Sequence, residues 1–122
     1  LLDCAAELGL FVLLETFDAA DVAVAHELCA RWRGAAPDCL VGVNSRNLQT
    51  LQVVPERLEE LAPALPPGFP RVAESGLAVP ADAARLARAG YDLALVGSAL
   101  MTADDPAALA HAMIAAGREA RR

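Results

Sequence analysis

The stretch CLVGVNSR, residues 39–46, is an apolar run that ends on polar side chains at Asn44 and Arg46. A continuous run without polar alternation is typical of a parallel strand buried on both faces. Three other runs end on polar residues in the same way: FVLLE (11–15), PRVAESG (70–76) and DLALVGS (92–98). The chain therefore contains four strand-like segments, each followed by polar residues of its own.

The spacing of these runs indicates a helix between each pair. Glu15, Asn44, Glu74 and Gly97 follow one another at intervals of 29, 30 and 23 residues, about one strand–helix unit each. Such alternation predicts a parallel α/β sheet. A complete (β/α)8 barrel typically needs about 250 residues. A chain of 122 residues with four units therefore predicts half of a TIM barrel.

Punctuating residues divide the chain into elements. Gly9 stops a helix at 1–9, Asp18 caps the next helix, Pro55 lies in the first turn of a third and Pro80 opens a fourth. The expected strands are 10–15, 39–43, 71–73 and 93–96. The expected helices are 18–33, broken by Gly34 to Pro37, then 53–65, 80–90 and 106–120. Residues 1–9 are thus the end of a preceding helix, and 10–122 form four βα units of one domain.

Composition narrows the functional class. The net charge is −6, which argues against nonspecific nucleic-acid binding. No apolar stretch is long enough to span a bilayer, and the N-terminus lacks the features of a secretory signal. It also lacks Met and begins inside a helix, so we interpret it as an internal cut. Three cysteines, without CxxC spacing, predict neither a disulfide framework nor a metal site, and fit small thiols in a reducing cytoplasm.

Polar residues at strand ends are the candidates for chemistry, because barrels of this kind place their sites at the C-terminal ends of the strands. Gly97 and Ser98 precede a short helical turn and could grip a phosphate group, with Gly76 supplying a matching backbone donor. The alternative is that these glycines only make tight turns.

Two acids and an Asn–Arg pair complete the candidate set. Glu15 and Glu74 end apolar strands, where a raised pKa would suit an acid or base. The alternative for these acids is a salt bridge, for example with Arg46, or helix capping. Asn44 could bond a sugar hydroxyl while Arg46 clamps a carboxylate. The alternative for this pair is a polar loop held by its own side chains.

In order along the chain, four motifs resemble the second half of the indole-3-glycerol-phosphate synthase family. They are LLET (13–16), GVNSRNL (42–48), AESGL (73–77) and LVGSALMTADDP (95–106). In that family they end or follow barrel strands five to eight. The resemblance covers essentially the whole chain.

The resemblance implies a decarboxylating ring closure in tryptophan biosynthesis. The substrate would be 1-(2-carboxyphenylamino)-1-deoxyribulose 5-phosphate, and neither cofactor nor metal would take part. Three groups of residues carry over from the family. They are the catalytic Glu15, Asn44 and Glu74; the substrate-binding Arg46, Leu48 and Ser75; and the phosphate-binding Gly76, Gly97 and Ser98.

The chain departs from the family in one decisive respect. The family's general acids are lysines on the first and third strands, and this sequence contains no lysine. Arginine cannot replace them, because its pKa stays above about 12. We therefore expect no activity from this segment alone. A smaller departure is that Ser45 and Asn47 stand where Asn and Asp are commoner.

Two other interpretations remain open. One is a noncatalytic phosphate-binding half-barrel that self-associates, because four strands leave two sheet edges and an uncovered face. The other is a different phosphate-binding barrel enzyme, such as phosphoribosylanthranilate isomerase. The expected partners are a small phosphorylated substrate and either an N-terminal half-barrel or a second copy of this chain, with no nucleic acid and no membrane.

Overall fold

The computed structural model describes residues 1–32 and 39–122, and contains one four-stranded sheet in the order β1-β2-β3-β4. All neighbouring strands are parallel. The strands are β1 (Val12–Thr16), β2 (Cys39–Asn44), β3 (Arg71–Glu74) and β4 (Leu93–Leu95). The predicted parallel α/β architecture of four strand–helix units is confirmed.

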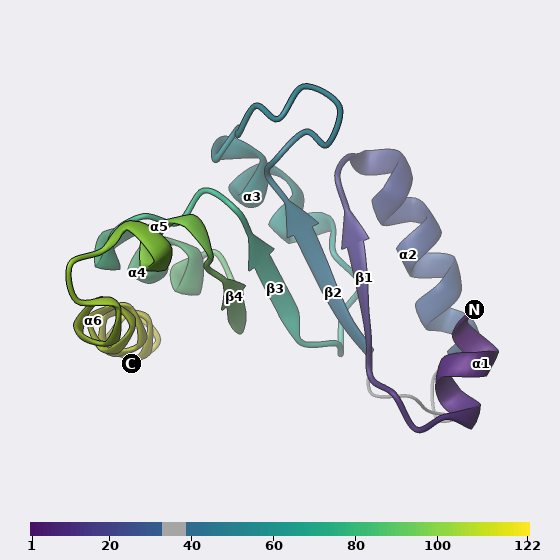
Figure 1. The fold of residues 1–122 in the computed structure, drawn as a ribbon. Helices are drawn as coiled ribbons and strands as arrows, with labels where there is room; N and C mark the ends of the chain where they lie inside the picture. The colour runs from purple at the N-terminus through teal and green to yellow at the C-terminus, as the bar shows by residue number, and fades with distance from the viewer. Residues whose placement is uncertain (33–38) are drawn as a thin grey trace.

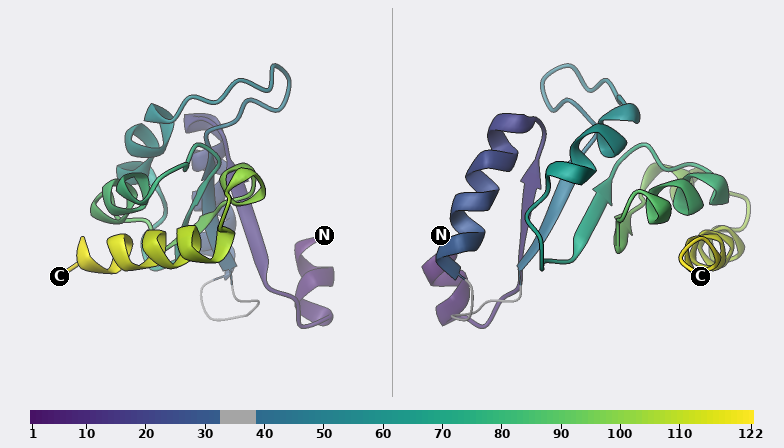
Figure 2. Two further views of the ribbon diagram at one scale, coloured as in Figure 1. Left: turned by 60° about the vertical axis from the view of Figure 1, so that its left-hand side comes forward. Right: turned by 180° about the vertical axis from the view of Figure 1, so that it is seen from behind.

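Helices precede, connect and follow the strands. They are α1 (Leu2–Glu7), α2 (Ala19–Trp32), α3 (Glu56–Leu61) with the 3-10 turn η1 (Ala62–Ala64), α4 (Pro80–Arg88), α5 (Ser98–Thr102) and α6 (Pro106–Glu119). Seen from behind, α2, α3 and α4 lie on the near side of the sheet, and none of these three covers its far face (Figures 1 and 2). None of the described helices is long and apolar enough to cross a membrane.

Local chemistry explains where several helices start and stop. Asp18 Oδ1 accepts hydrogen bonds from the backbone N–H groups of Ala20 (2.9 Å) and Asp21 (3.0 Å), which confirms the predicted cap of α2. Gly9 follows α1 at a φ of 66°, a conformation that glycine adopts without steric cost. The predicted break at Gly34 to Pro37 lies outside the described residues.

The third helix differs from the prediction. It begins at Glu56 rather than at residue 53, because the segment after β2 folds back on itself. Asn47 N donates to Gln52 O (2.8 Å) and Val54 N donates to Ser45 O (2.9 Å). The helix then tightens into η1, whose Pro63 has no N–H to continue α-helical bonding.

The hydrophobic core lies between the sheet and the helices. Val41, Val43 and Ala73 are fully buried on the covered side, against Leu58 of α3 and Leu86 of α4. On β4, by contrast, Leu93 is 49% exposed and Leu95 is 51% exposed. The uncovered face therefore keeps large apolar side chains in contact with water, next to the strand ends that carry the polar candidates.

Candidate functional site

The parallel register brings the predicted polar residues to one edge of the sheet. Glu15 lies opposite Gly42, and Asn44 lies opposite Glu74, which in turn pairs with Leu95. The ends of β3 and β4 and the loops after β2, β3 and β4 line a cavity of about 750 Å³. It is within the usual range for small-molecule sites, roughly 300–1,000 Å³. Six of the nine predicted residues line it: Arg46, Glu74, Ser75, Gly76, Gly97 and Ser98.

Asn44 links three of these strand ends through its side-chain amide. Its Nδ2 donates to Glu15 Oε2 (3.4 Å), while its Oδ1 accepts from Arg46 N (2.9 Å) and Ser75 Oγ (3.1 Å). Asn44 and Glu15 do not line the cavity themselves. Asn44 is bonded to Arg46 and Ser75, which do, and it connects Glu15 to them. One amide thus fixes the relative positions of four predicted residues.

Glu74 is a buried acid of the site whose pKa is raised. It is only 3% exposed, and its Oε1 has no hydrogen-bond partner among the described residues. Burial raises the pKa of Glu74 to about 8, with further contributions from the negative charge of Glu15 and a side-chain hydrogen bond to it. At neutral pH this group therefore carries a proton that it can give to a ligand in the cavity.

The turn after β3 has an unusual backbone. Ser75 has a φ of 65° and Gly76 a φ of 77°, so two successive residues adopt the left-handed conformation. For Ser75 this costs about 1–2 kcal/mol, and strain of this kind often accompanies a functional site. The turn is held from β2 by Ser45 N, which donates to Glu74 O (2.9 Å). It directs Ser75 Oγ toward Asn44 and leaves Gly76 on the wall of the cavity.

Arg46 and Leu48 lie on the loop that follows β2. Arg46 Nη1 donates to the carbonyl of Leu51 (3.2 Å), so the guanidinium is partly held by its own loop. Neither Glu15 nor Glu74 forms an ion pair with Arg46 among the described residues. Leu48 is 72% exposed and is not among the residues that line the cavity. The structure therefore brings eight of the nine predicted residues together and leaves Leu48 outside.

The sequence did not single out Thr16 and Gly42, which the structure places in β1 and β2 beside the predicted residues. Thr16 is buried, and its Oγ1 donates to the carbonyl of Gly42 (2.8 Å). A Cβ atom on Gly42 would overlap Glu74 Oε1 and lie 3.0 Å from Glu74 Cδ. The one sequence signal for this arrangement is a glycine inside an apolar strand, which often marks a close approach.

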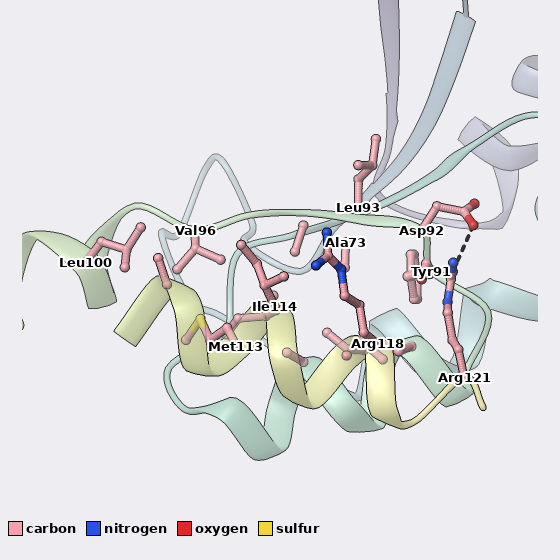
Figure 3. Close-up of a pocket in the computed structure, with 17 residues that line it drawn as sticks. Ala73, Tyr91, Asp92, Leu93, Val96, Leu100, Met113, Ile114, Arg118 and Arg121 are labelled. Carbon is pink, nitrogen blue, oxygen red and sulfur yellow. Dashed lines mark hydrogen bonds and ion pairs between the residues drawn. The ribbon is translucent and has the colours of Figure 1, made fainter. Parts of the chain in front are cut away.

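A second cavity, of about 510 Å³, lies between β4, α4 and α6 (Figure 3). Its lining is mainly apolar and includes Met113, Ile114 and Leu93. At one end Arg121 forms an ion pair with Asp92 (2.8 Å). None of the nine predicted residues lines this cavity, so we assign it no part in the candidate site.

No group of three or more His, Cys, Asp and Glu side chains suited to a metal ion occurs among the described residues. The groups available at the strand ends are two carboxyls, an amide, two serine hydroxyls, a guanidinium and glycine backbone. Such a set can move protons and bind an anionic ligand.

Comparison with known proteins gives the family. The family described as "Indole-3-glycerol phosphate synthase" matches residues 1–113, which include all nine predicted residues. Proteins of that name from Kineococcus radiotolerans and Methanothermobacter marburgensis are 41% and 42% identical over 110 residues, covering 90% of this chain and 37% of each relative. A third, from Parafrankia sp., is 40% identical over 117 residues, covering 96% of this chain and 41% of the relative. The chain thus spans about two fifths of these relatives' length.

A solved structure shares the fold. It is titled as the Amycolatopsis orientalis BexX/CysO complex, and the matched chain superposes with a TM-score of 0.60 at 25% identity. The match covers 91% of this chain and 41% of that one. Together with the family match, the four parallel βα units are consistent with half of a TIM barrel. The chain belongs to the indole-3-glycerol phosphate synthase family.

Proposed function

We propose that the strand-end cavity is part of the active site of an indole-3-glycerol phosphate synthase, a carboxy-lyase of tryptophan biosynthesis. The reaction joins the carboxyl-bearing ring carbon of 1-(2-carboxyphenylamino)-1-deoxyribulose 5-phosphate to its ketone carbon, with loss of carbon dioxide and water. The observation that carries this proposal is the convergence of Arg46, Glu74, Ser75, Gly76, Gly97 and Ser98 on one cavity, in a chain that matches the family throughout these positions.

The proposed catalytic residues are Glu15, Asn44 and Glu74. Ring closure makes an alkoxide that must be protonated, and the later dehydration moves further protons. Glu74 is suited to hold a proton near neutral pH, because burial raises its pKa to about 8. Glu15 is exposed at the same edge and is suited to accept a proton or to stabilise a cation. Asn44 is bonded to Glu15 and to Ser75, and it orients both.

The proposed binding residues divide between the two ends of the substrate. Arg46 would hold the carboxylate, Ser75 the sugar portion and Leu48 the aromatic ring. Gly76, Gly97 and Ser98 would take the phosphate. A Cβ atom on Gly97 would meet nothing within 4 Å, so a ligand can approach its backbone closely.

We propose that this segment alone does not catalyse the reaction. The chain has no lysine to serve as the family's general acid, and we infer that a complementary N-terminal half-barrel supplies it. This inference is supported by the exposure of Leu93 and Leu95 and by the two edge strands, β1 and β4. A partner that pairs with these edges would complete the sheet and cover its open face. A second copy of this chain is the alternative occupant, and would give a noncatalytic phosphate-binding assembly. We place the enzyme in the cytoplasm, where the exposed thiol of Cys4 would stay reduced.

Ligand binding tests the site directly. The chain is titrated with indole-3-glycerol phosphate, followed by calorimetry, and with inorganic phosphate in parallel. We expect Gly97→Asp to weaken binding of both by at least about tenfold, because a carboxylate would then face the phosphate. Ala112→Asp, which adds the same charge at an exposed position of α6, should leave it unchanged. Equal affinity in Gly97→Asp and the unsubstituted chain would overturn the phosphate assignment.

A further inference from the structure

The carboxyl group of Glu74 fills the space that a side chain on Gly42 of β2 would occupy. Glu74 pairs in register with Asn44, two residues beyond Gly42 along the same strand. Its side chain leans back across β2, so that a Cβ atom on Gly42 would overlap Oε1 and lie 3.0 Å from Cδ. Leu13 Cδ1 bounds the same space at 3.1 Å. The space above Gly42 is therefore occupied by the site's buried acid.

The backbone of Gly42 does not itself demand glycine. Gly42 is not among the residues with a positive φ, and it lies in a regular strand paired on both sides. Glycine inside an element costs about 0.5–1 kcal/mol relative to alanine, so its presence there needs another reason. The close approach of Glu74 supplies that reason.

The direction in which Glu74 leans determines its partner. Gly42 pairs in register with Glu15 of β1, so the Glu74 carboxyl group that lies over Gly42 is brought toward Glu15, whose negative charge helps to raise the pKa of Glu74. The strand on which this contact depends is held by Thr16 Oγ1, which donates to Gly42 O. Two neighbouring carboxyl groups can share a hydrogen bond only when at least one of them is protonated.

We propose that Gly42 is a positioning residue, whose missing side chain lets the Glu74 carboxyl group cross β2 and share a proton with Glu15. The carboxyl groups of Glu15 from β1 and Glu74 from β3 then exchange a proton across β2. The inference deepens the proposed function and rests on it for the catalytic consequence, but the carboxyl contact can be measured without substrate. Glu15 faces Glu74 from β1 without lining the cavity. Among the residues that line the cavity, the charged one besides Glu74 is Arg46 from the loop after β2, whereas β4 contributes the uncharged Leu95.

The test is a carbon-13 NMR titration of the chain labelled at the glutamate side-chain carboxyls. The signal absent from Glu74→Gln is assigned to Glu74. In the unsubstituted chain we expect it to titrate near pH 8. In Gly42→Ala the added methyl group displaces the carboxyl toward water, and its midpoint should fall by at least about one pH unit. Gly117→Ala in α6, where a Cβ meets only an ordinary contact at 3.8 Å, is the matched control and should leave the midpoint unchanged.

A second variant keeps the test decisive if Gly42→Ala does not fold. Glu74→Ala removes the carboxyl that the new methyl would strike, so Gly42→Ala combined with Glu74→Ala should unfold cooperatively at nearly the urea midpoint of Glu74→Ala alone. An unchanged Glu74 midpoint in folded Gly42→Ala would overturn the inference, as would a double variant as unstable as Gly42→Ala. If the titration behaves as expected while the completed enzyme lacks turnover, the proposed function fails and the positioning role stands.

Discussion

The protonation of Glu74 should change the free energy of unfolding of the chain with pH. The acid titrates near pH 4.5 when unperturbed and near pH 8 in the folded chain. Between these values the folded chain binds more protons than the unfolded chain. The free energy of unfolding must therefore fall as the pH rises through this window. Allowing for screening by water at the open edge, we expect the loss to be roughly 3 kcal/mol.

The measurement is urea unfolding of the chain and of Glu74→Gln at pH 5, 6.5 and 8. The glutamine variant has no charge to bury, so its stability should fall much less across the same window. Glu60→Gln, at an exposed position of α3, serves as the control and should follow the unsubstituted chain. Parallel curves for Glu74→Gln and the unsubstituted chain would show that Glu74 is ionised at neutral pH.

Thr16 carries a second prediction at the residue scale. Its buried hydroxyl donates to Gly42 O (2.8 Å), and Thr16→Val keeps the shape while removing the donor. We expect a loss of about 1–2 kcal/mol in the free energy of unfolding, measured by urea denaturation. Thr50→Val, at an exposed loop position, should change it by less than about 0.5 kcal/mol. A neutral Thr16→Val would mean that this hydrogen bond does not hold β1 against β2.

At the scale of elements, α6 is capped by Asp105, the second of two adjacent acids. Asp105 Oδ1 accepts from Ala108 N (2.9 Å) at the start of the helix. Asp105→Ala should lower the unfolding free energy by about 1 kcal/mol, because it leaves an N–H group of the first turn without its acceptor. Asp104→Ala removes the same charge one residue earlier, where no capping bond is formed, and should have a smaller effect. Thermal unfolding by circular dichroism compares the two, and equal losses would contradict the cap.

The elements themselves were largely predictable from the sequence. Continuous apolar runs marked all four strands, and Asp18 and Pro80 marked helix starts that the structure confirms. The third helix was predicted too long. Its first residues instead follow the fold-back in which Val54 N donates to Ser45 O, and local propensity does not encode that contact.

The candidate site was predictable in part. Polar residues after parallel strands must meet at one edge, so the convergence of Arg46, Ser75 and Gly97 followed from the pattern. The leaning of Glu74 across Gly42 did not follow, because it depends on side-chain packing between strands that lie 32 residues apart in the sequence. Leu48 came from family resemblance alone, and its role stays a prediction.

At the scale of the whole molecule, the uncovered sheet face should govern association. Leu93 and Leu95 are about half exposed on β4, which is an edge strand. We expect the chain to elute above its mass of 12.7 kDa in size-exclusion chromatography with light scattering. The variant Leu93→Gln with Leu95→Gln should shift it toward the monomer. Met101→Gln, 86% exposed on α5, should not, and a monomeric unsubstituted chain would contradict the expectation.

The central claim is that the strand ends form one half of a synthase active site, and turnover tests it most directly. This chain is mixed with the N-terminal part of the Kineococcus radiotolerans relative, and formation of indole-3-glycerol phosphate is followed by fluorescence. We predict product only when both parts are present, and a rate at least about a hundredfold lower with Glu15→Gln. A folded complex of the two parts that forms no product, under conditions in which the relative's complete enzyme is active, would contradict the claim.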